Sequence, residues 1–212
     1  MRITSVLFDL DGTLIDSGPL ILSSFQYATK NVLGREIPDD ELLAGVGGHG
    51  LEEQMRTFDT DRVEELVDVY RDHNLVEYEK VELFSGIREV VEELRERGYV
   101  LGVVTVKNRP AVDLTFDLLE LKEIFDVVIT GDDSIRQKPA PDPLLMALEA
   151  LNESVDRAVY VGDSPFDIQA SHAAGVMSVA VSWGGIHSKE KLLLENPDVI
   201  IDAPGEVLDV IS

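Results

Sequence analysis

A chain of 212 residues is long enough to bury a full hydrophobic core, as one domain or as one domain with a small insertion. Its 18 basic and 41 acidic residues give a formal charge of −23, which repels nucleic acids and anionic membranes, so we expect neither as a partner. The chain has no cysteine, which excludes disulfides, thiolate metal sites and a catalytic thiol.

The first third of the chain begins with a strand and continues with helices. A β-rich apolar run predicts a buried strand over residues 3–8, and Gly12 breaks the run soon after it. Between residues 19 and 80 the apolar residues recur at helical spacing, with no strand-like run. The helices predicted in this block cover residues 19–33, 38–43, 51–58 and 61–79.

From Phe84 onward the pattern alternates between helices and short apolar strands. The predicted helices cover residues 87–97, 111–119, 143–151 and 168–174. The predicted strands cover residues 99–106, 126–130, 158–161 and 177–182, with 199–201 as an edge strand. Such alternation is typical of βαβ units and of a parallel sheet covered on both faces.

Since the first strand belongs with this repeat, the helical block reads as an insertion. We predict an α/β fold, a doubly wound and mostly parallel sheet, with its core in residues 1–15 and 82–212. Residues 16–81 are predicted to form an inserted α-helical cap.

Polar side chains follow the predicted strands where those strands end, and one lysine precedes a core helix. In an open parallel sheet these ends lie at the edge where ligands bind. Carboxylates brought together there repel one another, and a hard divalent cation such as Mg²⁺ would relieve the repulsion. A lysine and a hydroxyl could donate hydrogen bonds to phosphoryl oxygens, so the set predicts phosphoryl transfer. Its members are Asp9, Asp11, Thr105, Lys138, Asp163 and Asp167.

At these residues the chain resembles the haloacid dehalogenase superfamily. The run from Phe8 to Leu14 matches the first motif of the family, and Thr105 after a strand matches the second. Lys138 before Pro139 matches the third motif, and the run 162–167 matches the fourth. The order and spacing match over essentially the whole chain, and the inserted helices look like the C1 cap of the family. Phosphoglycolate-phosphatase-like members are the most similar, judged by the runs 16–17, 138–143 and 183–184.

The resemblance implies a nucleophile and an acid–base group in the first motif. Asp9 would attack the phosphorus and bind Mg²⁺, with the Leu10 carbonyl as a second metal ligand. Asp11 would protonate the leaving oxygen and later activate the water that hydrolyses the aspartyl-phosphate. The second acid also argues against dehalogenation, because protonation of the leaving group is what such an acid serves in phosphate ester cleavage.

The other motifs are implied to hold the phosphoryl group and the metal. Thr105, the Val106 N–H and Lys138 would bind the phosphoryl oxygens. Asp163 would complete the metal site, and Asp167 would belong to it by orienting a metal-bound water or Lys138.

Simpler interpretations of some residues stay open. Asp167 could be only the N-cap of the following helix, and Thr105 could only end its strand. His49, which lies among glycines, is expected either to reach the substrate from a cap loop or to sit in a hinge between helices.

We therefore predict a Mg²⁺-dependent phosphatase that hydrolyses a small phosphorylated metabolite such as 2-phosphoglycolate. A phosphomutase or a pyrophosphatase of the same family is the alternative, since these enzymes share the core motifs. A phosphoacceptor signalling domain is the alternative from another class, but it needs neither the Asp9 and Asp11 pair nor the inserted helices. The oligomeric state is expected to be a monomer or a homodimer.

The acidic residues are spread along the chain, and the chain has only seven lysines but eleven arginines. This pattern favours adaptation to high salt, where screening removes the repulsion between like charges.

The chain has no apolar run long enough to cross a bilayer, and acidic residues lie where a signal peptide would need small residues. We expect a cytoplasmic protein.

Overall fold

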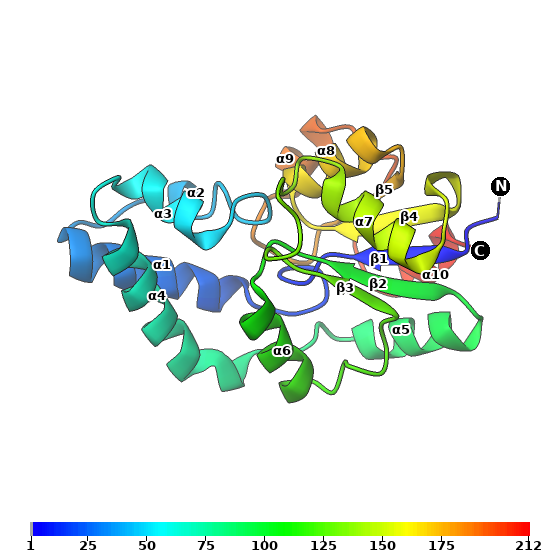
Figure 1. The fold of residues 1–212 in the computed structure, drawn as a ribbon, viewed down its shortest axis with the longest axis horizontal. Helices are drawn as coiled ribbons and strands as arrows, with labels where there is room; N and C mark the ends of the chain where they lie inside the picture. Colours follow the sequence, from blue (N-terminus) through cyan, green and yellow to red (C-terminus); the bar gives the residue numbers. More distant parts are fainter. Residues whose placement is uncertain (1) are drawn as a thin grey trace.

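Within residues 2–212, which the computed structural model describes, parallel strands form one six-stranded sheet in the order β3-β2-β1-β4-β5-β6 (Figure 1). The strand that comes first in the chain is central, and the order runs outward from it in both directions. The doubly wound α/β fold and the edge position of the last strand are therefore confirmed. The strands are β1 (Ser5–Phe8), β2 (Val100–Val104), β3 (Val127–Ile129), β4 (Ala158–Gly162), β5 (Met177–Val181) and β6 (Val199–Ile201).

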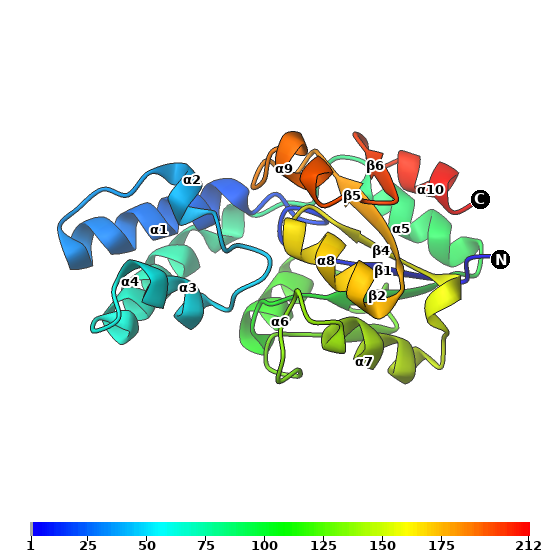
Figure 2. The same cartoon turned by 90° about the horizontal axis from the view of Figure 1, so that it is seen from above.

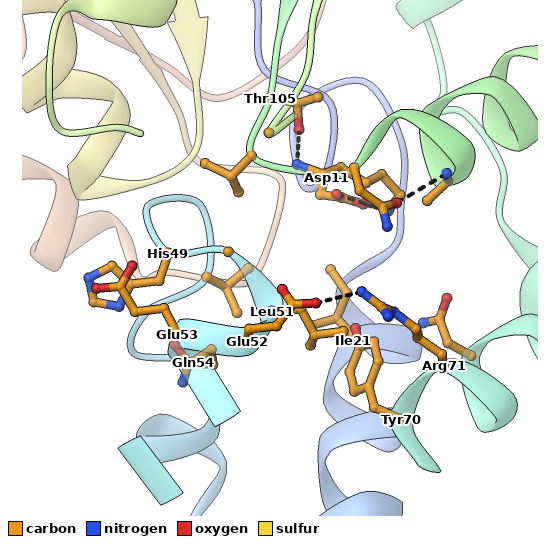
Figure 3. A pocket seen from close by; sticks show the side chains of 18 of the residues that line it. Asp11, Ile21, His49, Leu51, Glu52, Glu53, Gln54, Tyr70, Arg71 and Thr105 are labelled. Atoms are coloured by element: carbon orange, nitrogen blue, oxygen red, sulfur yellow. Dashed lines mark hydrogen bonds and ion pairs between the residues drawn. The ribbon is translucent and has the colours of Figure 1, made fainter. Parts of the chain in front are cut away.

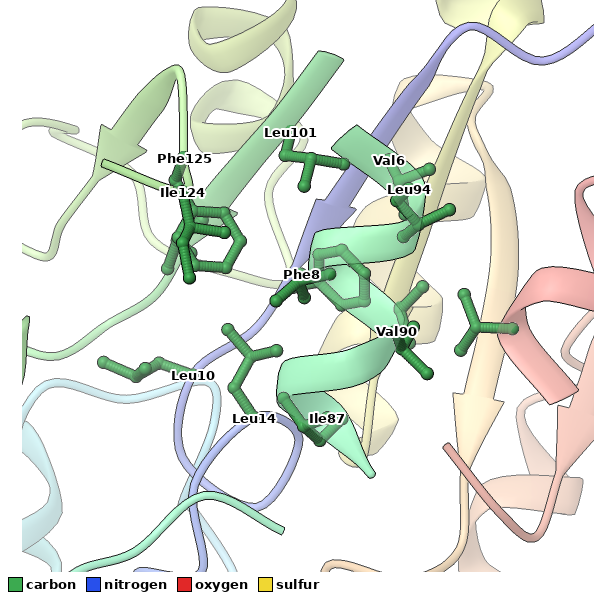
Figure 4. Close-up of a cluster of buried hydrophobic side chains, with 14 of the residues drawn as sticks. Val6, Phe8, Leu10, Leu14, Ile87, Val90, Leu94, Leu101, Ile124 and Phe125 are labelled. Atoms are coloured by element: carbon green, nitrogen blue, oxygen red, sulfur yellow. The ribbon is translucent and has the colours of Figure 1, made fainter. Parts of the chain in front are cut away.

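Both faces of the sheet are covered, which explains why its strands are largely apolar. Val6 and Phe8 point to one face and pack against α5 and the chain before β3 (Figure 4). Leu7 belongs to the cluster on the opposite face. The Phe8 ring meets the Phe125 ring edge to face, with 6.3 Å between the ring centres. Full burial of a side chain such as Phe8 contributes about 1.5–3 kcal/mol, so the central strand is strongly anchored.

Helices cover the two faces as the βαβ pattern predicts. One face carries α5 (Ile87–Glu96), α6 (Arg109–Leu118) and α10 (Glu206–Val210). The opposite face carries α7 (Asp142–Leu151), α8 (Pro165–Ala174) and α9 (Lys189–Leu194). The sequence did not predict α9 and α10, because helices of six and five residues leave little apolar periodicity to detect. Short 3₁₀ turns lie at Tyr78–Lys80 and Val155–Arg157.

The helical segment between β1 and α5 lies beyond one end of the sheet (Figure 2). It consists of α1 (Gly18–Leu33), α2 (Asp39–Leu42), α3 (Leu51–Phe58) and α4 (Val63–Glu77), which match the four predicted helices closely. The end of α1 follows its sequence signal: Gly34 has a φ of 69° and donates its N–H to the Lys30 carbonyl at 3.1 Å.

The helical segment has a hydrophobic cluster largely of its own. Phe25 lies at its centre, with its ring 5.8 Å from that of Phe58 and 4.8 Å from that of Tyr70. A separate cluster lets the segment pack as a unit over the end of the sheet. None of the helices in residues 2–212 combines the length and the apolar composition needed to cross a membrane.

Candidate active site

The register of the central strands brings the predicted site residues to one edge of the sheet. Phe8 lies opposite Val103 on one side and Val161 on the other. The Asp9 N–H donates to the Val161 carbonyl at 2.9 Å, which extends the ladder by one residue. Asp9 therefore leaves the sheet between the loops that follow β2 and β4.

A buried network of charges surrounds Asp9. The Lys138 Nζ lies 3.1 Å from Asp9 Oδ1 and 2.6 Å from Asp167 Oδ1, and all three side chains are at most 3% exposed. The Tyr160 hydroxyl, which the sequence analysis missed, is 3.0 Å from the same Nζ and donates to the Val104 carbonyl at 2.7 Å. Buried charges need such partners, because an unpaired one would cost several kcal/mol.

This buried network contains more carboxylates than cations, and little solvent reaches it. Burial raises the pKa of Asp9 from 3.8 to about 7, although Lys138 opposes the shift. Burial, together with Asp167 and Asp9, raises the pKa of Asp163 well above its ordinary value. Burial works against the charge on Lys138, but Asp167 and Asp9 hold its pKa above its ordinary value. One buried ammonium thus faces three carboxylates.

These carboxylates fit a divalent metal ion. Asp9, Asp163 and Asp167 each offer an oxygen, and these oxygens all lie within 4.8 Å of one another. The Asp163 Oδ2 is buried and has no hydrogen-bond partner among residues 2–212. Gly12, with a φ of 77°, lies directly against this carboxylate: a Cβ there would come 2.1 Å from Asp163 Oδ2. The clustered oxygens and the unpaired Oδ2 are what a hard cation with oxygen ligands would use.

Asp167 has hydrogen bonds to both of its oxygens. Oδ1 contacts Lys138 and Tyr160, and Oδ2 accepts from the Ser164 N–H at 2.9 Å and the Ser164 hydroxyl at 2.6 Å. The N-cap of α8 is Ser164, and Asp167 completes its capping box from the third helical position. Asp167 is therefore not the N-cap, and its contacts are those of a residue that orients Lys138.

The Leu10 carbonyl does not point to the metal cluster. It accepts the N–H groups of Leu14 at 3.0 Å, Ile15 at 3.1 Å and Thr13 at 3.3 Å, because the chain after β1 closes into a tight turn around it. An oxygen that already accepts three N–H groups has no free lone pair for a cation. The prediction of Leu10 as a metal ligand is wrong.

Thr105 and Val106 lie in the loop that follows β2. The Thr105 Oγ1 accepts the Lys107 N–H at 3.2 Å, so the local bond of a strand end is present. Thr105 and Val106 also line the cavity that Asp9 and Asp11 line. The loop is held close to the sheet edge because Gly131 donates its N–H to the Lys107 carbonyl at 2.9 Å.

Asp11 has two partners that the sequence analysis did not identify. The Ser17 hydroxyl donates to Asp11 Oδ1 at 2.7 Å, and the Lys107 Nζ lies 2.8 Å and 3.0 Å from the two carboxylate oxygens. Burial works against the charge on Lys107, but Asp11 holds its pKa above its ordinary value. Lys107 follows Thr105 by two residues, a spacing that could have drawn attention to it.

The cavity has a volume of about 610 Å³ and lies between the sheet edge and the helical segment. Asp11 and Thr105 lie on one side, and Glu52, Tyr70 and Arg71 lie on the other (Figure 3). Arg71 and Glu52 form an ion pair of 2.7 Å across that second wall. The cavity is therefore built by both parts of the chain.

The glycine-rich loop before α3 packs on the core and brings His49 to the cavity. A Cβ at Gly48 would lie 2.3 Å from the Phe166 ring, so backbone meets side chain directly there. The His49 ring centre is 5.5 Å from that of Phe166. His187 is buried, with Nε2 2.9 Å from the Val46 carbonyl of the same loop. His49 therefore lines the cavity, and its contact with a substrate stays a prediction.

Comparisons with known proteins agree over nearly the whole chain. The model of the haloacid dehalogenase-like hydrolase family matches residues 6–181. A proposed pyrophosphatase PpaX of Caldanaerobacter subterraneus is 39% identical, over 100% of this chain and 96% of that protein. Pyrophosphatase PpaX of Bacillus mycoides is 36% identical, over 100% and 98%. The crystal structure of a proposed phosphoglycolate phosphatase from Lactobacillus plantarum has a TM-score of 0.87 and 25% identity, over 99% of this chain and 100% of that one.

Proposed function

The chain belongs to the haloacid dehalogenase-like hydrolase family, and from this premise we propose that it is a divalent-metal-dependent phosphatase with Asp9 as its nucleophile. Family membership confirms the resemblance found in the sequence. It also argues against a phosphoacceptor signalling domain, since the family is one of hydrolases.

The main support for this proposal is the position of the Asp9 carboxylate. The carboxylate of Asp9 is buried at the end of β1, has Lys138 at 3.1 Å, and belongs to the same cavity as Asp11 and Thr105. A buried carboxylate next to a cavity, with a cation at one side and a second acid two residues away, is the arrangement that covalent phosphoryl transfer needs.

The reaction would proceed in two steps. In the first, an Asp9 oxygen bonds to phosphorus while the bond to the leaving oxygen breaks, and Asp11 gives that oxygen a proton. In the second, water bonds to the phosphorus of the aspartyl-phosphate and gives its proton to Asp11. The bond to Asp9 then breaks, which releases inorganic phosphate, restores the Asp9 carboxylate and leaves Asp11 protonated for the next cycle.

Other residues would hold the phosphoryl group during both steps. The Lys138 ammonium and the Thr105 hydroxyl and Val106 N–H are donors at the same sheet edge, and they would neutralise or hydrogen-bond its oxygens. Mg²⁺ held by Asp9 and Asp163, with Asp167 close by, would neutralise further phosphoryl charge. The helical segment would act as a cap that keeps bulk water out of the cavity.

We propose pyrophosphate and 2-phosphoglycolate as the two candidate substrates. The names of the relatives from Caldanaerobacter subterraneus and Bacillus mycoides favour pyrophosphate, and that of the Lactobacillus plantarum protein favours 2-phosphoglycolate. Both substrates are small enough for a cavity of about 610 Å³.

Phosphate release from both compounds, with Mg²⁺ and with EDTA, tests the proposal. We expect metal-dependent release from at least one of them and complete loss of release in the Asp9→Asn variant. An Asp113→Asn variant makes the same chemical change on the exposed surface of α6 and should keep full activity. Substantial release by Asp9→Asn would disprove the assignment of the nucleophile.

A further inference from the structure

Lys107 presents its ammonium to the active-site cavity from a firmly held loop. Its N–H donates to Thr105 Oγ1 at 3.2 Å and its carbonyl accepts from Gly131 at 2.9 Å, so its backbone is held on both sides. The side chain is 14% exposed, and its Nζ lies 5.6 Å from the centre of the Tyr78 ring. The direction of the ammonium is therefore set by its surroundings.

The other cations that line this cavity are less suited to bind a substrate anion. Arg71 and its partner Glu52 are both about half exposed, so water screens the charge of Arg71 far more than that of Lys107. Arg56 is exposed to solvent. Because charge interactions strengthen as water is excluded, the sheltered ammonium of Lys107 offers the strongest attraction to an anion. Within residues 2–212, Lys107 is the one cavity-lining cation that is also in contact with Asp11.

The contact with Asp11 places this ammonium near the leaving group. A group that protonates the leaving oxygen must come within about 2.6–3.2 Å of it. The Lys107 Nζ lies 2.8 Å from Asp11, so it lies within about 6 Å of the same oxygen when substrate is bound. An ammonium has three N–H donors, and the two oxygens of Asp11 engage two of them. The third N–H of Lys107 is therefore available to bind the leaving group of the substrate.

We propose that Lys107 is a specificity-determining residue that binds a second anionic group, carried by the substrate directly beside the bridging oxygen. This inference rests on the proposed function and narrows its substrate class. In pyrophosphate the second phosphoryl group is bonded to the bridging oxygen, and in 2-phosphoglycolate a carboxylate lies one carbon away from it. Phenyl phosphate has an apolar ring at that position and offers Lys107 no anion.

Kinetics on these three substrates test the inference through a selectivity ratio. A charge-assisted hydrogen bond is worth about 10- to 100-fold, so Lys107→Met should lower kcat/KM for pyrophosphate and 2-phosphoglycolate, relative to phenyl phosphate, by about that factor. Lys107→Arg keeps a cation and should retain most of the ratio. Lys122→Met removes the same charge from an exposed surface position and should leave the ratio unchanged. Equal losses on all three substrates, or no loss, would overturn the proposal.

A binding measurement keeps the test independent of turnover. Methylenediphosphonate carries a second anionic group and methylphosphonate does not, and neither is hydrolysed. By calorimetry in Mg²⁺ buffer, Lys107→Met should weaken the first ligand about 10- to 100-fold more than the second. An unchanged affinity ratio would refute the role of Lys107 even if no substrate were turned over. By contrast, residual turnover by Asp9→Asn would refute the proposed function and leave this ratio intact.

Discussion

Asp9→Asn should stabilise the metal-free protein while it abolishes turnover. The Asp9 side chain is 3% exposed, and burial raises the pKa of its carboxyl group from 3.8 to about 7. Asparagine has nearly the same shape as the protonated carboxyl group but cannot ionise. The variant therefore avoids the cost of a buried negative charge, and that cost can be worked out from the shift in pKa.

The direction in which stability changes with pH follows from how tightly the folded and unfolded states bind the Asp9 proton. Because the folded-state pKa lies above the unfolded value, the folded protein binds this proton more tightly than the unfolded chain does. The wild type then loses stability as the pH rises from 3.8 to about 7. A rise in pKa from 3.8 to about 7 is worth about 4 kcal/mol, of which about 2–3 kcal/mol is lost above about pH 5. The raised pKa of Asp163 lowers the stability of the wild type and of the variant in the same direction as the pH rises. It therefore does not reverse their difference in free energy of unfolding.

Urea denaturation in EDTA measures this difference. We expect Asp9→Asn to exceed the wild type in free energy of unfolding, by a margin that widens by about 2–3 kcal/mol between about pH 5 and pH 8. Added Mg²⁺ should narrow the margin, because a bound cation offsets the charge in the wild type. Asp113→Asn, on the exposed surface, should show no such margin. An Asp9→Asn variant less stable than the wild type at about pH 8 in EDTA would refute the reasoning.

Three further predictions concern the surroundings of Asp9 and the acidic surface. Tyr160→Phe removes a hydroxyl that contacts Val104 and Lys138, so we expect a loss of about 1–3 kcal/mol in urea unfolding and a lower kcat. Gly48→Ala would place a Cβ 2.3 Å from the Phe166 ring, so kcat/KM should fall and the added Phe166→Ala change should restore part of it; no rescue would contradict the contact. With a net charge of −23, the protein should melt at a higher temperature in molar KCl than at low salt, and a flat profile would reject salt adaptation.

The fold could be predicted largely from the sequence because its main elements have strong local signals. Strong apolar runs and glycine stops marked the central strands and α1, and the helix at 51–58 agrees with α3 at both ends. Two short helices, α9 and α10, escaped detection. Each contributes a single fully buried residue, Leu192 and Val207 respectively, which is too little for a periodic pattern.

The site could be predicted only where side chains follow strand ends. Asp9, Asp11 and Thr105 meet at one edge because parallel strands carry them there. The direction of the Leu10 carbonyl depends on how the turn closes, which residue types do not reveal. Tyr160 lies inside β4 and looks like an ordinary core residue until its hydroxyl is seen beside Lys138.

Residues from the helical segment were the hardest to anticipate. Tyr70 and Arg71 reach the cavity from α4, opposite Asp11 and Thr105 of the sheet edge (Figure 3). Their helix reads as an ordinary amphipathic one, so neither residue stands out in the sequence.

Trapping the covalent intermediate on Asp9 tests most directly whether this carboxylate is the nucleophile. The enzyme would be quenched during turnover with Mg²⁺ and pyrophosphate or 2-phosphoglycolate and treated with borohydride, which reduces an acyl phosphate to an alcohol. Peptide mass spectrometry would then locate the change. We expect homoserine at position 9 in the wild type and no conversion in Asp9→Asn. Turnover without conversion at position 9, or conversion at another carboxylate, would contradict it.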